Sequence, residues 1–231
     1  MASAFDRQRH IKYFAHHLVQ LPYPYSSLDT NRLTLVHFAV HALDMLQVWD
    51  DDALVAKLGL NKTKIIDWIY NLQVTAPSQA GFQGGTFLGN AFGEDVVGEG
   101  GEYNKGHIAM TYTALCTLTM LGDDLSRVHS GKIISALKTL QTSDGSFKCV
   151  PGIGSEQDTR FLFCACAISH MLKDWSGVDQ DLAVEFIKDC RSFDGAIALI
   201  PGQVSCVLFW LFYIDRQTIV CGQLSAPFSF I

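Results

Sequence analysis

Apolar residues recur along most of the chain at the spacing of amphipathic helices. One such segment runs from Asp6 to Leu21 and is stopped by Pro22, which cannot continue a helix. A second runs from Arg32 to Leu46, and Ser27 or Asp29 could cap its beginning. Its apolar positions are spaced three or four apart: Leu33, Val36, Val40 and Leu43. We expect these segments to form an outer and an inner helix.

The helical pattern then repeats with a period of about fifty residues. Residues 137–147 match residues 187–195, and more loosely 69–82, and each of these segments reads as a helix that ends on a glycine turn. The helix expected after His107 is in phase with the one expected after Asp158. Paired helices at this period predict stacked helical hairpins, closed into a ring or left open as a solenoid. The predicted fold class is therefore all-α.

This pattern stops at Gln203. Residues 204–214 are almost continuously apolar and fit neither phase of the repeat. We therefore expect two parts, a repeat domain over residues 1–203 and an unrelated apolar tail over residues 204–231.

Composition narrows the class of protein. With 231 residues, 48% apolar and 17% charged, the chain can bury a sizeable core. A net charge of -6 and 17 Lys plus Arg without a basic run argue against a nucleic-acid partner. No apolar run reaches the ~18 residues of a membrane span, and charges interrupt the N-terminal stretch where a signal peptide would be apolar. Seven cysteines, set in apolar faces as at Cys164 and Cys166, indicate reduced thiols and a cytoplasmic protein.

Glycines gather between the third and fourth predicted helices. They include Gly84 and Gly85 and continue to Gly101. The stretch lacks the Lys-Ser/Thr ending of a phosphate-binding loop, and no strand precedes it. We interpret it as a long irregular connection rather than a nucleotide site.

One charged pair is a candidate binding group. Glu156 and Arg160 are four residues apart and would share a helical face if the helix has begun by Glu156. The repeat phase places His107 at the inner end of the preceding hairpin. The residues alone favour a surface ion pair and a hydrogen-bonded histidine over a joint site.

Two other groups receive a structural interpretation. His37, His41 and Asp44 have a spacing that could hold zinc, but no Glu follows His37 as in a zinc-protease motif, so packing is favoured. Asp50–Asp52 resembles the catalytic acid of terpene cyclases without its fourth position, and reads as a solvated turn. Trp68 reads as a packing residue.

Several short motifs stand together in the pattern of one known family. They are Ser26-Ser27-Leu28, Arg32-Leu33-Thr34, Gly106 to Thr113, Leu121 to Arg127 and Asp144 to Phe147, followed by Asp158 and Arg160. From about Phe5 to Gln203 they resemble the β subunit of protein geranylgeranyltransferase type I. The resemblance implies an α–α barrel, or toroid, of inner and outer helices, incomplete in this chain. It also implies zinc and a heterodimer with a helical prenyltransferase α subunit.

The resemblance further implies a reaction and its substrates. A geranylgeranyl group passes from geranylgeranyl diphosphate to the Cys of a C-terminal CaaX sequence, in proteins such as small GTPases ending in Leu. His107, Glu156 and Arg160 would hold the CaaX carboxylate through water. The implied lipid-tunnel residues are Thr34, Phe38, Arg160 and Phe163. Farnesyltransferases carry a Trp at the position of Thr34, and the smaller residue leaves room for a fourth isoprene unit. On periodicity alone Thr34 and Phe38 read as core.

Beyond Gln203 the chain departs from the family. There the family has a basic patch for the diphosphate, then an Asp-x-Cys pair and a later His that bind zinc, whereas residues 204–231 are unrelated. Zinc lowers the pKa of the acceptor thiol, and the basic patch balances the leaving diphosphate. We therefore expect a shortened β subunit without zinc ligands or catalytic residues, inactive alone. The alternatives are a non-catalytic fragment that binds the α subunit, or a farnesyltransferase-like β subunit.

Overall fold

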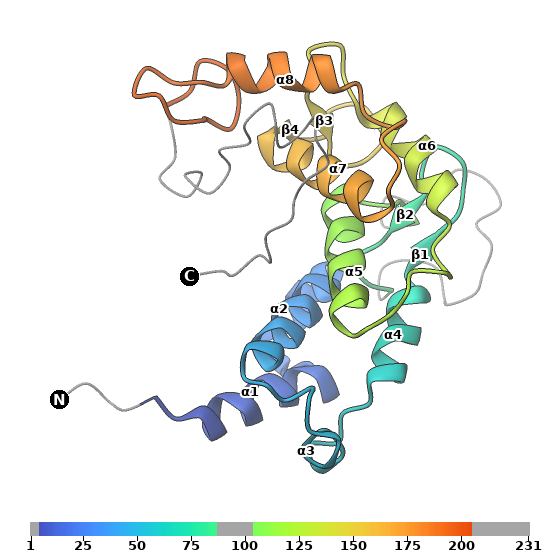
Figure 1. Ribbon diagram of the computed structural model, residues 1–231, viewed down its shortest axis with the longest axis vertical. Helices are drawn as coiled ribbons and strands as arrows, with labels where there is room; N and C mark the ends of the chain where they lie inside the picture. The colour runs from blue at the N-terminus through green and yellow to red at the C-terminus, as the bar shows by residue number, and fades with distance from the viewer. Residues whose placement is uncertain (1–4, 87–103, 205–231) are drawn as a thin grey trace. The chain divides into compact units, whose positions relative to one another are not determined.

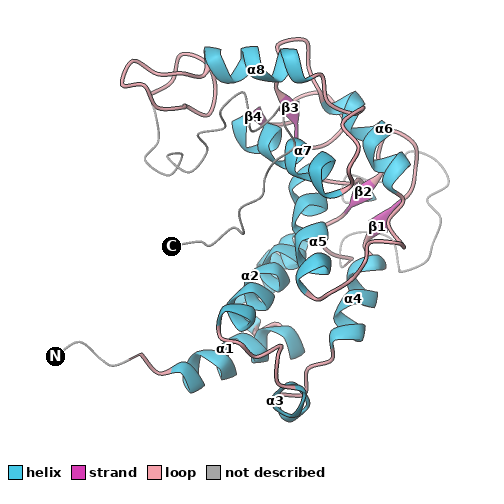
Figure 2. Ribbon diagram, viewed as in Figure 1, coloured by secondary structure: helices cyan, strands magenta, loops and turns pink. Residues whose placement is uncertain are grey.

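The computed structural model describes residues 5–86 and 104–204 (Figure 1). Helices make up nearly all of the regular structure, with two short two-stranded ladders (Figure 2). The predicted all-α class is confirmed. None of the described helices is long and apolar enough to cross a membrane. The chain divides into two compact units, Met1–His129 and Ser130–Ile231, and each is described by itself.

Two sequence predictions concern residues outside the described ranges. The apolar tail falls there apart from Val204, and so does the part of the glycine-rich connection from residue 87 to residue 103. Both stay predictions.

The first unit is built around the predicted helix pair. Its elements in chain order are α1 (Arg7–Val19), a 3-10 helix η1 (Tyr23–Asn31), α2 (Arg32–Met45), α3 (Asp52–Lys57), α4 (Lys62–Tyr70), β1 (Gln73–Val74), β2 (Gly81–Phe82) and α5 (Ile108–Met120). Helix α2 packs on α1 and on α5. Between α1 and α2 lies an apolar cluster that includes Ile11, Ala15, Val40 and Leu43. The expected hairpin of α1 and α2 is confirmed.

Local capping explains where three of these helices begin. Asp6 accepts a hydrogen bond from the Arg9 amide at 3.0 Å, Asp51 from Leu54 at 2.9 Å, and Asn61 from Lys64 at 3.0 Å. Each bond satisfies an amide that has no partner within its own helix. The acidic run Asp50–Asp52 is therefore a helix start rather than only a solvated turn.

The predicted cap of α2 is wrong. Ser27 and Asp29 lie inside η1, and the N-cap residue Asn31 makes no side-chain capping bond. Instead the Leu33 amide donates to the carbonyl oxygen of Gly84 at 2.9 Å. A Cβ on Gly84 would lie 1.9 Å from the Thr30 carbonyl oxygen, so only glycine lets the two backbones approach this closely.

The second unit repeats the same helix-and-ladder arrangement. Its elements are α6 (Ser130–Leu140), β3 (Phe147–Lys148), β4 (Gln157–Asp158), α7 (Thr159–Met171) and α8 (Gln180–Asp189). Strands β3 and β4 pair antiparallel, with Phe147 opposite Asp158. The buried residues of α7 include Cys164 and Cys166, and both are reduced cysteines. Burial raises the pKa of Cys166 to about 12, so this thiol stays protonated.

The turns after α6 and α8 confirm the predicted repeat. In the first, the Asp144 carboxylate accepts the Ser146 amide at 3.0 Å, and in the second Asp194 accepts the Ala196 amide at 3.2 Å. Gly145 and Gly195 hold left-handed φ values of +88° and +84° at corresponding positions. The matching sequences thus form the same turn.

Candidate functional site

The residues predicted to form a site fall into two groups, one in each unit. Thr34, Phe38 and His107 belong to the first unit, and Glu156, Arg160 and Phe163 belong to the second. The structure shows the local geometry of each group, and their meeting at one site stays a prediction.

On α2 the two predicted lipid-wall residues differ sharply in exposure. Thr34 is half-buried, and its hydroxyl donates to the sulfur of Met110 on α5 at 3.4 Å. Phe38, one turn later, is 61% exposed. The interpretation from periodicity alone, that both are core residues, is therefore wrong for Phe38. A small, half-buried side chain therefore lies one turn from an exposed aromatic ring on α2.

His37, on the same helix, is buried. Its Nδ1 lies 3.0 Å from the Thr117 hydroxyl oxygen. Because that hydroxyl donates to the Thr113 carbonyl oxygen at 2.7 Å, the histidine nitrogen is the donor. Burial, with a smaller contribution from His41, lowers the pKa of His37 to about 4. His37 is a packed, neutral histidine, as the sequence favoured.

The described residues hold no group suited to zinc. Within residues 5–86 and 104–204, no three or more His, Cys, Asp or Glu side chains gather so as to hold a metal ion. The His37, His41 and Asp44 set is thus not a metal site in the described structure, and no chemical step is assigned to a metal.

His107 is the N-cap residue of α5, and β2 holds its backbone. Its amide donates to the Phe82 carbonyl oxygen at 3.0 Å, and its Nδ1 accepts from the Ala109 amide at 3.1 Å. Because Nδ1 accepts this bond, a ring proton is assigned to Nε2.

Two glycines set the position of this cap. A Cβ on Gly106 would lie 2.7 Å from the Gln79 carbonyl oxygen, and one on Gly81 would lie 2.6 Å from the Thr111 hydroxyl oxygen. The same hydroxyl accepts the Phe82 amide at 2.9 Å. Both glycines are needed for the backbone of β2 to reach the start of α5, and so for the placement of His107.

The charged pair in the second unit differs from its prediction. Helix α7 begins at Thr159, and Glu156 precedes β4, so Glu156 and Arg160 do not share a helical face. Their side chains still meet, with Arg160 Nη2 at 3.4 Å from Glu156 Oε2. The backbone of Glu156 is held by its carbonyl oxygen, which accepts the Cys149 amide at 2.9 Å. The hairpin, rather than the helix, brings the two together.

Asp158 is the stronger partner of Arg160, and the sequence reasoning did not assign it this role. Its Oδ2 lies 2.6 Å from Arg160 Nη2 and 3.0 Å from Nε, and its Oδ1 also accepts the Arg160 amide at 2.8 Å as the N-cap of α7. The hydrogen bond with Asp158 raises the pKa of the guanidinium. An aspartate directly before a helical pattern is the signal that could have identified this cap.

Exposure decides which of the two carboxylates holds the arginine. The side chain of Asp158 is 8% exposed, whereas those of Glu156 and Arg160 are 72% and 48% exposed. Exposed ion pairs contribute only about 0–1 kcal/mol to stability. A bidentate pair between an arginine and a buried carboxylate fixes the orientation of the guanidinium. Asp158 therefore orients Arg160, and Glu156 adds an exposed acceptor beside it. Phe163, one turn along α7, is half-buried.

Comparison with known proteins places this geometry in a family. The family pattern described as the prenyltransferase alpha-alpha toroid domain matches residues 5–207. The geranylgeranyl transferase type-1 subunit beta of Arabidopsis thaliana is 35% identical over 206 residues, covering 87% of this chain and 52% of the relative. The corresponding Dictyostelium discoideum subunit is 37% identical over 218 residues, covering 88% of this chain and 60% of the relative. The chain therefore spans between half and two thirds of the length of these relatives.

A solved structure shows the same fold. Candida albicans protein geranylgeranyltransferase-I, complexed with GGPP, aligns with a TM-score of 0.67 at 20% sequence identity. The alignment covers 88% of this chain and 56% of the solved chain. The expected α–α toroid architecture is confirmed.

Proposed function

Because the chain belongs to the prenyltransferase alpha-alpha toroid family, we propose that it is a β subunit of protein geranylgeranyltransferase type I. The complete enzyme of this type pairs such a subunit with a prenyltransferase α subunit and transfers a geranylgeranyl group from its diphosphate to the Cys of CaaX proteins, including small GTPases ending in Leu. Identity of 35% and 37% to type-1 β subunits supports this choice.

The observation that carries the proposal is the Thr34 surface of α2. Thr34 is small, it contacts Met110, and the exposed ring of Phe38 lies one turn away. A tryptophan at this position would project further from the helix and occupy the space beside Phe38. With threonine the wall accommodates the longer, four-isoprene lipid.

We assign the residues at the start of α7 to the C-terminal carboxylate of the CaaX protein. Asp158 occupies Nε and Nη2 of Arg160, so the guanidinium is oriented with Nη1 still available for an oxygen ligand. Glu156 supplies an exposed acceptor for a water molecule next to it. The family resemblance adds His107, the N-cap residue of α5, to this set. Such a mixed set of donors and an acceptor suits a carboxylate that is bound through water.

We propose that the 231-residue chain does not transfer lipid by itself. In the family the zinc ligands and the diphosphate patch follow the stretch equivalent to Gln203, and residues 204–231 do not match that pattern. Zinc activates the acceptor thiol where it is bound, and the described residues of this chain do not fit it. The contribution of this chain is then lipid and peptide recognition.

Lipid binding in the presence of the α subunit tests the proposal. The full chain is co-expressed with the α subunit, and affinities for fluorescent geranylgeranyl and farnesyl diphosphates are compared. We expect a preference for geranylgeranyl that Thr34→Trp reverses. Thr63→Trp, at an exposed position of α4, is the matched control and leaves the preference unchanged.

The other outcomes separate the alternatives. A preference for farnesyl diphosphate in the parent chain contradicts the type I assignment and favours a farnesyltransferase-like subunit. Unchanged selectivity in Thr34→Trp contradicts the role given to Thr34. Stable binding to the α subunit without lipid binding favours a non-catalytic partner. Transfer of lipid to a CaaX peptide contradicts the proposed inactivity.

A further inference from the structure

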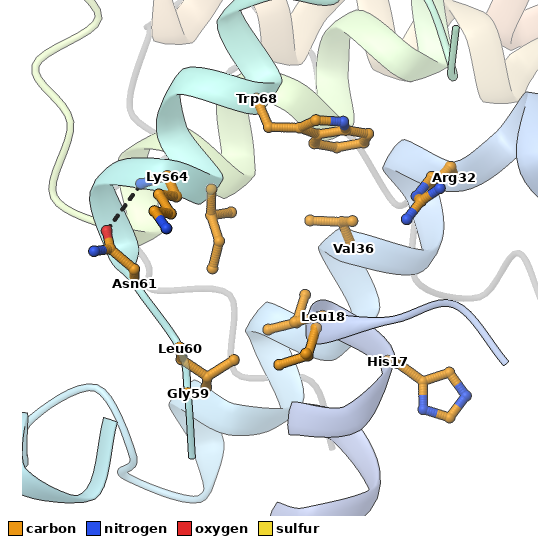
Figure 3. Close-up of a pocket in the computed structure, with 11 residues that line it drawn as sticks. His17, Leu18, Arg32, Val36, Gly59, Leu60, Asn61, Lys64 and Trp68 are labelled. Carbon is orange, nitrogen blue, oxygen red and sulfur yellow. Dashed lines mark hydrogen bonds between the residues drawn. The ribbon is translucent and has the colours of Figure 1, made fainter. Parts of the chain in front are cut away.

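The first unit contains a pocket that the proposed function does not use. Residues of α1, α2 and α4, together with the loop that leads into α4, line a cavity of about 260 Å³ (Figure 3). It is distinct from the α2 positions of Thr34 and Phe38, neither of which lines it. The cavity is therefore separate from the proposed lipid-wall positions.

The walls of this pocket are mainly apolar. Leu18 comes from α1, Val36 from α2 and Trp68 from α4 (Figure 3). Ile65 of α4 also lines the pocket. Leu18, Val36 and Ile65 are partly buried residues that pack against the apolar core of the unit. Core packing therefore holds these three side chains in place. The indole of Trp68 forms one side, so a flat apolar ligand has a ring to stack on.

The polar residues of the pocket are biased toward positive charge. Arg32 and Lys64 line it from α2 and α4, and none of its lining residues is Asp or Glu. Asp29 accepts one bond from Arg32 Nη1, at 3.2 Å, and no other residue in the described ranges accepts one from this guanidinium. No described residue pairs with the ammonium group of Lys64. The imidazole of His17 points away from the apolar side chains (Figure 3).

We propose that this pocket binds a small apolar carboxylate, with a planar ring system against Trp68 and Ile65 and its carboxylate at Lys64. Arg32 lies on the opposite side of the pocket (Figure 3) and adds positive charge without contacting the carboxylate. Burial of the ring supplies the main affinity, because apolar contacts dominate small-molecule sites while a few polar groups set orientation. The volume is below the roughly 300–1,000 Å³ of drug-sized sites, which limits the ligand to one or two fused rings. The ligand is a free small molecule rather than a segment of a partner protein.

A pair of probes that differ only in charge tests this site in the full 231-residue chain. 1-Naphthoate and 1-naphthalenemethanol share the ring, and only the first carries a carboxylate. Titration calorimetry at pH 7.5 should give one naphthoate site per chain, with the alcohol binding about fivefold more weakly, as expected for an exposed charge-assisted contact. Several weak sites per chain, or equal affinity for both probes, would overturn the proposal.

Variants locate the site. Lys64→Gln should weaken naphthoate about fivefold and leave the alcohol unchanged, because it removes only the charge. Lys12→Gln, an exposed lysine of α1 outside the pocket, is the matched control and should change neither. A loss of affinity in Lys12→Gln as large as that in Lys64→Gln would mean that only long-range charge attracts the probe, and would contradict the assignment.

Two further variants keep the test independent of the charge effect. Val36→Phe fills the cavity and should abolish binding of both probes, and circular dichroism shows whether the variant is folded. Trp68→Phe keeps an aromatic wall and should retain binding while losing the quenching of tryptophan fluorescence by naphthoate. Unchanged binding in folded Val36→Phe, or unchanged quenching in Trp68→Phe, would place the probe elsewhere. Lipid transfer is not measured in these tests, so their outcome is independent of the proposed prenyltransferase role.

Discussion

Lowering the pH should destabilise the folded chain through His37. This side chain is 9% exposed, and burial, assisted by His41, lowers its pKa from 6.5 to about 4. In the unfolded chain His37 takes up a proton below pH 6.5, whereas the folded chain resists it until about pH 4. Between these values the unfolded state binds more protons, so the free energy of unfolding decreases as the pH falls.

The size of this effect follows from the two pKa values. A shift of one pKa unit corresponds to about 1.4 kcal/mol, so the full contribution of His37 is about 3 kcal/mol, present above pH 6.5 and lost below pH 4. At pH 5 the loss relative to pH 8 is about 2 kcal/mol. Burial also lowers the pKa of His41, against an opposing contribution from Asp44, so His41 adds to the loss in the same direction.

Urea unfolding at pH 8 and pH 5, followed by circular dichroism, measures the loss. We expect His37→Gln, which keeps an N–H donor for Thr117 but cannot take up a proton, to lose about 2 kcal/mol less than the parent chain over this interval. His129→Gln, at an exposed position, is the control and should behave like the parent. The same pH dependence in the parent and in His37→Gln would refute the reasoning.

Three further outcomes are expected. Asp158→Asn keeps a capping oxygen but removes the charge that holds Arg160, and it should lower the free energy of unfolding by about 1 kcal/mol in urea melts. Glu156→Gln, at an exposed position, should change it by less than about 0.5 kcal/mol. A larger loss in Glu156→Gln than in Asp158→Asn would contradict Asp158 as the main partner of Arg160. Gly84→Ala should cost at least about 2 kcal/mol because its Cβ would meet the Thr30 carbonyl oxygen at 1.9 Å, while Gly131→Ala, with open space around its Cβ, should be neutral or stabilising in the same melts. The purified chain, with or without the α subunit, should hold no stoichiometric zinc by elemental analysis and should transfer no lipid to a CaaX peptide, and zinc lost on changing His37 or His41 would contradict this.

Local sequence was sufficient for the elements that depend on residues close together in the chain. The helix at Arg7–Val19 was predicted within two residues, and the pattern shared by residues 137–147 and 187–195 formed matching turns at Asp144 and Asp194. Apolar periodicity and a side chain that caps its own turn act within a few residues. The family resemblance was carried by motifs of the same local kind.

The errors have a common cause, which is a partner distant in the sequence. The start of α2 is capped by the carbonyl oxygen of Gly84, and no reading of residues 27–31 could show that. The exposure of Phe38 could not be predicted from its helix, because an apolar position on α2 is buried only where another element covers it. Left-handed turns also escaped detection where the residue is not glycine, as at Gln47 and Lys173 after α2 and α7.

The sequence by itself determined the all-α class, the hairpin repeat and the family, because helical periodicity, turn chemistry and motif identity are properties of short segments. Only the tertiary structure decided which groups meet. It showed Asp158 rather than Glu156 as the main partner of Arg160, because the β3–β4 hairpin presents both carboxylates to the first turn of α7 and buries only one. It likewise set the low pKa of His37, since desolvation depends on the side chains that surround a group and not on its neighbours in the chain.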